Sequence, residues 1–226
     1  CWEFDRLFQE IKNGLKKCKE IGKIPVSMGV DTWGVDFVLM DKDDKVLGNT
    51  VGYRDHRNEG MDEEVYKTIS LEDLYARTGI QKAIFNTVYQ LMAVKTKHPE
   101  YLEQAETMLH VPDYFHYLLT GKKTCEYTEA TTGQLVNAET KDWDYELIDK
   151  LGYPRKMFQK LIMPGTSVGH FTEEVKAEVG FDVEVVAPAT HDTGSAVLAV
   201  PANDDDFIYI SSGTWSLMGI EREKAD

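Results

Sequence analysis

The stretch Ala189-Thr190-His191-Asp192-Thr193-Gly194-Ser195-Ala196 decides how this chain is interpreted. Residues 183–186 before it, three of them valines, have the pattern of a strand, and the small residues after Asp192 can open a helix. In α/β proteins the ends of strands open onto the ligand crevice, so an acid at such a junction is a candidate reactive group. The stretch also contains Asp-Thr-Gly-Ser, which is typical of half an aspartic-protease site. Two chemistries therefore compete for Asp192.

The protease interpretation is the weaker of the two. An aspartic protease needs two carboxylates that share a proton. The chain has one Asp-Thr-Gly triplet, because Asp31-Thr32-Trp33 breaks the pattern, so a homodimer would have to supply the second. Residues 196–200 favour a helix before Pro201, and the rest of the chain is rich in helical patterns. Aspartic proteases are nearly all β, so the residues favour an α/β enzyme.

Composition limits the class of protein and its partners. The 226 residues are 42% hydrophobic and 28% charged, as in an ordinary soluble globular protein. A net charge of −14 argues against nucleic acid or an anionic membrane as a partner, although helix N-termini, backbone amides and Mg²⁺ can still hold a phosphate. No apolar run approaches the ~20 residues of a membrane span. The cysteines, Cys1, Cys18 and Cys125, are few and widely spaced, which predicts reduced thiols in a cytoplasmic protein.

Hydrophobic periodicity predicts a mixture of helices and strands, which supports the α/β class. A first helix runs from Phe4 and ends at Gly22, and Ser70 with Asp73 resembles a capping box for a helix that stops at Gly79. Further helices are predicted over residues 87–97, 99–106, 112–119, 145–151 and 173–179. Strands are predicted over residues 24–30, 107–111, 183–186 and 207–210, with a hairpin of 35–40 and 45–47 around the polar turn 41–44.

Eight motifs, in the same order along nearly the whole chain, carry a resemblance to a known family. They are Asp31-Thr32-Trp33-Gly34-Val35-Asp36-Phe37, Tyr53-Arg54-Asp55-His56-Arg57, Gly79-Ile80-Gln81, Phe85-Asn86-Thr87-Val88-Tyr89-Gln90-Leu91, Pro112-Asp113-Tyr114-Phe115, Glu126-Tyr127-Thr128, His191-Asp192-Thr193 and Ser211-Ser212-Gly213-Thr214-Trp215-Ser216-Leu217-Met218-Gly219. Together they resemble the FGGY family of carbohydrate kinases, and within it the members that act on L-rhamnulose. The ordered set is far more specific than any one motif.

The resemblance implies an actin-like, ribonuclease-H-like fold with a cleft between two lobes. It places a partial N-terminal sugar-binding lobe over residues 1–203 and the beginning of the C-terminal nucleotide-binding lobe over residues 204–226. It also implies transfer of the ATP γ-phosphate to L-rhamnulose, giving L-rhamnulose 1-phosphate in L-rhamnose breakdown, with ATP and Mg²⁺ as cofactors.

Phosphoryl transfer needs positioning, charge stabilisation and one group that accepts the hydroxyl proton, and a carboxylate suits that last role. By the resemblance, Asp192 is this base, and His191 and Thr193 hold the sugar beside it. Gly34 matches a position where the absent side chain makes room for the ketose, and Thr214 matches a nucleotide contact. Asp192 is also a favourable helix N-cap residue, and the two roles can coexist.

Other candidates have two interpretations that the sequence leaves open. Trp33 is either an apolar face for the sugar or a core aromatic, and Asp55 and Arg57 either bind sugar hydroxyls or form a surface ion pair. Asp31 and Asp36 could help to place Mg²⁺, but carboxylates at strand ends are common, and no residue is predicted as a metal ligand. The remaining histidines show no metal-ligand spacing and are interpreted as structural or surface residues: His56, His98, His110, His116 and His170.

The resemblance also sets an expectation about extent. Full members of the family begin with a strand and a phosphate loop and continue into a second lobe, so we expect this chain to be the middle of a kinase, with little activity on its own. One alternative is a non-catalytic sugar-binding module derived from such a kinase. Another is a sister kinase that acts on xylulose, fuculose or glycerol.

Overall fold

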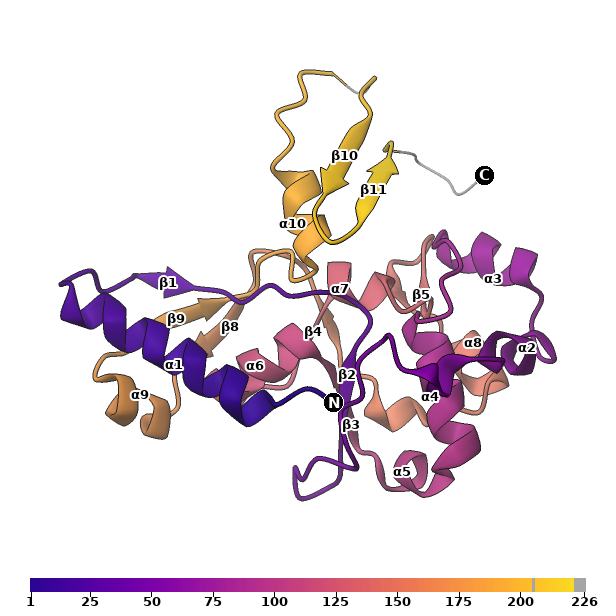
Figure 1. Ribbon diagram of the computed structural model, residues 1–226, viewed down its shortest axis with the longest axis horizontal. Coiled ribbons are helices and arrows are strands. Elements are labelled where there is room, and N and C mark those ends of the chain that lie inside the picture. Colours follow the sequence, from indigo (N-terminus) through magenta and orange to yellow (C-terminus); the bar gives the residue numbers. More distant parts are fainter. Residues whose placement is uncertain (205, 222–226) are drawn as a thin grey trace.

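The α/β class predicted from the sequence is confirmed by a computed structural model, which describes residues 1–204 and 206–221 (Figure 1). Its helices are α1 (Phe4–Glu20), α2 (Met61–Tyr66), α3 (Leu71–Thr78), α4 (Thr87–Lys97), α5 (Pro99–Gln104), α6 (Val111–Thr120), α7 (Tyr127–Thr131), α8 (Tyr145–Lys150), α9 (Glu173–Val179) and α10 (Asp192–Leu198), with 3-10 turns η1 (His56–Asn58) and η2 (Arg155–Met157). Its strands are β1 (Ser27–Met28), β2 (Phe37–Met40), β3 (Thr107–His110), β4 (Cys125–Glu126), β5 (Val136–Asn137), β6 (Asp142–Trp143), β7 (Leu161–Ile162), β8 (Ser167–His170), β9 (Glu184–Val186), β10 (Tyr209–Ser212) and β11 (Ser216–Gly219).

A three-stranded sheet, ordered β1-β9-β8, leads the chain to Asp192. β1 runs parallel to β9 and β8 runs antiparallel to it. Leu15 of α1, Val175 and Val179 of α9, and Val185 of β9 are buried in one cluster, which holds both helices against the sheet (Figure 1). The predicted strand over residues 24–30 is reduced to the two residues of β1, because only those two pair with β9.

A second, larger core surrounds β2 and β3, which pair antiparallel and are buried at all four residues of each strand. α4 is buried from Thr87 to Val94 and fills this core. The predicted hairpin after β2 is present, since the amide of Asp41 donates to the carbonyl of Lys45 at 2.9 Å, but its second arm keeps only one bridge, Met40 with Val46. Gly48, with a φ of +67°, turns the chain away directly afterwards.

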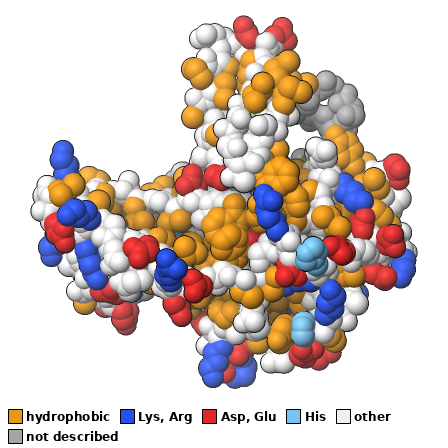
Figure 2. Space-filling model, in the orientation of Figure 1, with side chains coloured by type: hydrophobic (Ala, Val, Ile, Leu, Met, Phe, Trp, Pro, Cys, Tyr) orange, Lys and Arg blue, Asp and Glu red, His pale blue; other side chains and the backbone are white. Residues whose placement is uncertain are grey.

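The C-terminal part consists of α10 and the β10–β11 hairpin, which project from the rest of the molecule (Figure 1). The strand predicted over residues 207–210 is shifted, because Ser211 and Ser212 pair with Leu217 and Ser216. Hydrophobic side chains gather on this hairpin (Figure 2), where Ile210 is 67% and Met218 is 73% exposed. Of the lobe predicted over residues 204–226, residues 205 and 222–226 lie outside the described part of the chain.

Helix caps agree with the sequence where the signals are local. The Ser70 hydroxyl accepts the amide of Asp73 at 3.0 Å, and α3 ends at Gly79 in the left-handed region, as predicted. Asp144 caps α8 by accepting the amide of Leu147 at 3.0 Å, and it also binds the Arg77 guanidinium of α3 through two bonds of 2.8 Å. Burial raises the pKa of Asp144, but the bonds from Arg77, Leu147 and Asn137 outweigh it and hold the pKa below its ordinary value.

Asp144→Ala is expected to lower the free energy of unfolding at pH 7 by about 2–4 kcal/mol, because it removes a helix cap and leaves Arg77 without its buried partner. Urea unfolding measures this loss. Since the native pKa of Asp144 is lowered, its contribution is present above the unfolded pKa of about 3.9 and is lost as the pH falls through the native pKa. The difference between wild type and variant should therefore shrink in acid.

The control is Asp149→Ala, which breaks an exposed ion pair with Arg155 and should cost less than about 1 kcal/mol. Equal losses in both variants, or a pH-independent loss for Asp144→Ala, would contradict this account.

Candidate functional site

Asp192 is the first residue of α10, and His191 occupies the N-cap position, one residue earlier than the N-cap interpretation of Asp192 requires. The Asp192 side chain is 58% exposed. Its Oδ1 accepts the amide of Thr193 at 2.6 Å and the Thr193 hydroxyl at 3.2 Å. Within the described residues no hydrogen bond reaches Oδ2. One oxygen is thus held by Thr193, and the other is available to accept a proton.

A single parallel bridge fixes the backbone beside Asp192. The amide of Thr32 donates to the carbonyl of Thr190, and the amide of Asp192 donates to the carbonyl of Thr32, both at 2.9 Å. Thr32 directly precedes Trp33 and Gly34, so the bridge brings these two predicted site residues to the segment that carries His191 and Asp192. They are more than 150 residues apart in sequence.

Glu126, for which the sequence predicted no role, holds the segment that carries Thr190 and His191 from the interior. Its carboxylate is fully buried and accepts the amide of Thr190 at 3.0 Å, the Thr190 hydroxyl at 2.9 Å and the amide of Thr128 at 2.9 Å. It also caps α7. The Thr128 hydroxyl in turn accepts the amide of His191 at 3.4 Å. Glutamate is not a favoured N-cap residue, so propensity could not identify it.

Gly34 precedes a strained residue. Val35 has a φ of +71°, which is a rare conformation for a β-branched side chain. Its amide donates to the Thr132 hydroxyl at 3.1 Å, and its carbonyl accepts from Thr87 and Gln90 at 2.7 and 3.2 Å. A Cβ on Gly34 would lie 3.0 Å from Cγ2 of Thr132. The absent side chain that was predicted to make room for a ketose therefore also makes room for the threonine that holds Val35.

Asp36 is a buried acceptor for four donors. Its Oδ2 accepts the indole N–H of Trp2 at 2.7 Å, that of Trp33 at 2.9 Å and the amide of Tyr53 at 3.3 Å, while Oδ1 accepts from Gln90 at 3.1 Å. Burial raises the pKa of Asp36, and these hydrogen bonds offset part of the rise. A carboxylate occupied in this way does not fit a magnesium ligand, which removes Asp36 from the candidates for Mg²⁺.

Trp33 is fixed on two sides. Besides donating to Asp36, its ring lies 4.2 Å from that of Trp2, centroid to centroid. These partners are those of a core aromatic, although the residue is only half-buried. The contact of Trp33 with a sugar stays a prediction.

Asp55 and Arg57 lie on a different surface from Asp192. Asp55 caps η1 by accepting the amide of Arg57 at 2.8 Å, while the Arg57 guanidinium donates to Gln90 at 2.9 Å, so within the described residues the two side chains form no ion pair. Both line a cavity of about 370 Å³ with Phe37, Lys97 and other residues. Of the described residues, Trp33, Gly34 and Asp192 are not in its wall. Gln90 and Asp36 connect the two surfaces through hydrogen bonds.

His191 and Thr214 complete the predicted set. Burial lowers the pKa of His191, and the Asp192 carboxylate, 3.8 Å from its Nε2, offsets part of this, so the ring is neutral near pH 7 and can donate or accept a hydrogen bond. Thr214 is exposed in the tip of the β10–β11 hairpin. Beside it, Trp215 packs against Phe85, with ring centroids 5.7 Å apart, and under the Arg54 guanidinium.

Exposed carboxylates suit Mg²⁺ bound to the phosphates of a phosphoryl donor better than buried carboxylates do. Mg²⁺ keeps several waters and uses one or two carboxylates together with substrate phosphates. Asp31 is exposed just before the Thr32 bridge, and Asp192 is exposed just after it, so both meet this requirement. Within the described residues, every helix is too short or too polar to cross a membrane.

Comparison with known proteins identifies relatives of the whole chain. A model of the FGGY family of carbohydrate kinases, N-terminal domain, matches residues 2–199. A rhamnulokinase of Halalkalibacterium halodurans is 58% identical over 221 residues, which cover 98% of this chain and 47% of that protein. A rhamnulokinase of Oceanobacillus iheyensis is 53% identical with the same coverage. The chain thus spans about half the length of the curated relatives it matches.

Solved structures agree on the fold. A ligand-bound xylulose kinase from Lactobacillus acidophilus has a TM-score of 0.84 at 20% identity and covers 95% of this chain and 44% of its own. A carbohydrate kinase from Novosphingobium aromaticivorans has a TM-score of 0.79 at 21% identity, covering 96% and 47%. At such identities the likeness concerns the fold alone, and it confirms the predicted actin-like architecture of a sugar-kinase N-terminal lobe.

Gly34→Ala is expected to destabilise the protein by about 1–3 kcal/mol, because the new methyl group forces Thr132 away from Val35. Chemical denaturation measures it. Gly14→Ala is the matched control: a Cβ there meets nothing within 4 Å in the middle of α1, so it should stabilise by about 0.5–1 kcal/mol.

Adding Thr132→Ser to Gly34→Ala removes the atom closest to the new methyl and keeps the hydroxyl, so it should restore part of the loss. A neutral Gly34→Ala would mean that Thr132 does not need this space.

Proposed function

Because this chain belongs to the FGGY family of carbohydrate kinases, we propose that it forms the sugar-binding part of an ATP-dependent kinase that phosphorylates L-rhamnulose to L-rhamnulose 1-phosphate. The observation that carries the proposal is Asp192, a carboxylate at a strand-to-helix junction with one oxygen unbonded among the described residues, flanked by His191 and Gly34. The choice of sugar is supported by rhamnulokinases at 58% and 53% identity, against 20% for the xylulose kinase.

In the proposed reaction, Oδ2 of Asp192 removes the proton from the sugar hydroxyl as that oxygen forms its bond to the γ-phosphorus, and the bond to the ADP oxygen breaks. Thr193 holds Oδ1, which turns the free oxygen outward. His191, neutral near pH 7, binds a sugar hydroxyl, and Glu126 keeps the segment in place through Thr190. ATP supplies the phosphoryl group and Mg²⁺ neutralises its charge, with Thr214 and Asp31 as the proposed contacts.

The proposed domain division follows the predicted one, with residues 1–203 in the sugar-binding lobe and residues 204–226 beginning the nucleotide-binding lobe. Two observations support it. The family match ends at residue 199, and the β10–β11 hairpin projects from the body beyond α10 (Figure 1). Asp55 and Arg57 line a separate cavity, which Gln90 and Asp36 connect to Trp33 through hydrogen bonds, and their contact with sugar hydroxyls is part of the proposal.

Asp192→Asn, made in the full-length kinase that contains these residues, is expected to lower kcat by 10²- to 10⁴-fold with little change in the KM for L-rhamnulose, because it removes the base and keeps the shape. A coupled ADP-release assay measures both constants. Asp43→Asn, at an exposed turn, is the control and should leave them unchanged. If Asp192→Asn kept more than about a tenth of the activity, Asp192 would not be the base.

The 226-residue chain on its own is expected to bind L-rhamnulose in a calorimeter and to show little ADP release, because it spans 47% of the length of its relatives. Xylulose, fuculose and glycerol are the comparison ligands. Sugar binding without ATP binding would also fit the non-catalytic module, and only the full-length assay separates the two. Robust turnover by the isolated chain would show that the rest of the kinase is dispensable.

A further inference from the structure

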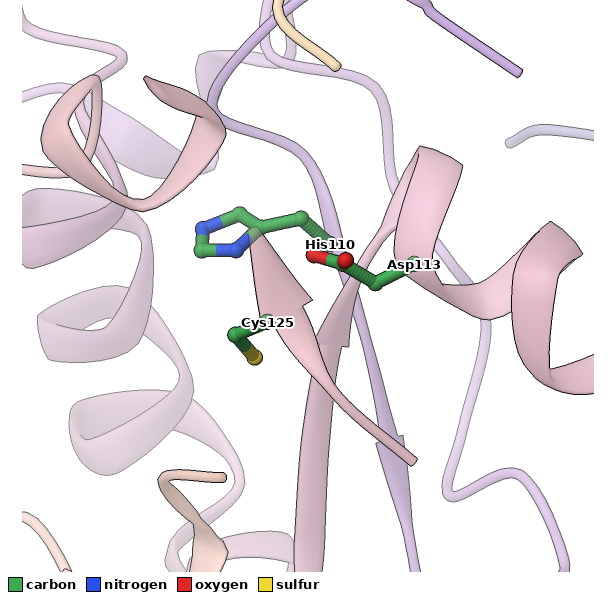
Figure 3. Close-up of side chains that lie close together, drawn as sticks. All are labelled: His110, Asp113 and Cys125. Carbon is green, nitrogen blue, oxygen red and sulfur yellow. The ribbon is translucent and has the colours of Figure 1, made fainter. Parts of the chain in front are cut away.

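Three side chains that can ligate a metal lie close together in the interior (Figure 3). His110 ends β3, Asp113 lies in the first turn of α6, and Cys125 begins β4. All three are fully buried, and one ligand atom from each lies within 4.8 Å of the others. The sequence predicted a structural role for His110 because its spacing matched no metal motif. Spacing could not show that β4 returns beside β3, where the Cys125 thiol contacts the carbonyl of Met108 at 3.6 Å.

These side chains have few partners. Neither ring nitrogen of His110 is hydrogen-bonded within the described residues, and neither is Oδ2 of Asp113. The other Asp113 oxygen accepts the amide of Glu126 at 3.0 Å. A buried polar group without a partner costs about 1–3 kcal/mol. Two such residues at one place, His110 and Asp113, are therefore costly unless a ligand satisfies them.

The charges around the cluster select a cation. Glu129 is fully buried as well, with neither carboxylate oxygen bonded, and Glu126 adds a third acid. Within the described residues, no salt bridge from lysine or arginine reaches Asp113, Glu126 or Glu129. Without a cation, burial raises the pKa of Asp113 and of the Cys125 thiol well above their ordinary values, so these two groups keep their protons. It lowers the pKa of His110 to about 4, so the imidazole is neutral and a ring nitrogen is free of a proton.

The donor set selects the metal. A thiolate, an imidazole nitrogen and a carboxylate oxygen suit Zn²⁺, whereas Mg²⁺ and Ca²⁺ take oxygen ligands. We propose that His110, Asp113 and Cys125 bind a structural Zn²⁺ ion. Tetrahedral zinc sets its ligand atoms about 3.3–3.8 Å apart, so the side chains close by up to about 1.5 Å on binding. This site is independent of the proposed kinase function.

The ion would cross-link β3, α6 and β4 directly beneath Glu126. Cys125 precedes Glu126 in the chain, and Asp113 binds its amide. Glu126 in turn holds Thr190 two residues before Asp192. Zinc would therefore steady the anchor of the segment that carries the base without touching the substrate.

The test measures metal on the 226-residue chain, purified without a histidine tag, dialysed with Zn²⁺ and then freed of excess ion. About one zinc per chain is expected by mass spectrometry, with Co²⁺ giving the intense thiolate-to-metal absorption of a cysteine ligand. Zinc binds a cysteine as the thiolate, so calorimetry in two buffers should report the release of at least about one proton per ion near pH 7. Less than about a tenth of an ion per chain would overturn the proposal.

Cys125→Ser and His110→Gln should each weaken zinc binding at least about tenfold. Cys18→Ser and His56→Gln, outside the cluster, are the matched controls and should bind as the wild type does. Unchanged binding in both cluster variants would place the ion elsewhere and refute the site. If the cluster variants do not fold, the cobalt spectrum and the proton release of the wild type decide, since a site without a thiolate shows neither the absorption nor the loss of the thiol proton.

Discussion

The position of the candidate base depends on one buried carboxylate, that of Glu126. It accepts hydrogen bonds from the start of α7 and from Thr190, which lies 64 residues after Glu126 in the sequence. An ionised carboxylate accepts only, and bonds to it are about twice as strong as neutral ones. Both segments must therefore turn their donors inward at the same point. This sets the direction in which the chain leaves Thr190, and α10 begins two residues later at Asp192.

A second buried acid, Asp36, fixes the segment that carries Trp33 and Gly34 in a similar way. Asp36 gathers Trp2, Trp33, the amide of Tyr53 and Gln90 around one carboxyl group. Gln90 also donates a hydrogen bond to the carbonyl of the strained residue Val35, and it accepts a hydrogen bond from the Arg57 guanidinium. Val35 keeps its positive φ because the hydrogen bonds of this network hold its backbone in that conformation. Site loops thus owe their shape to hydrogen bonds satisfied in the interior, as is general for functional loops on a rigid scaffold.

Signals that are local in sequence could be predicted, and signals that depend on distant partners could not. The bounds of α4 and α9 agree with the predicted ranges, and the caps at Ser70 and Gly79 are confirmed, because periodicity and capping involve neighbours three or four residues apart. The roles of Glu126, Thr132 and Gln90 could not be inferred. Their partners lie 64, 97 and 54 residues away, so only the fold reveals them. The predicted bounds of β1 were wrong for the same reason, since its pairing with the distant strand β9 defines where it begins and ends.

The contrast between buried and exposed acids bears on which of them can do chemistry. The carboxylate oxygens of Asp36 and Glu126 accept hydrogen bonds from N–H and O–H donors in the interior. Burial raises the pKa of the other two acids, Asp113 and Glu129, well above the ordinary range. A general base must be ionised and within reach of the proton it removes. Asp192, with its side chain 58% exposed and one oxygen unbonded among the described residues, is open to an incoming hydroxyl. The interior acids fix the geometry, and the exposed aspartate is the acid of this group that fits the proposed role of base.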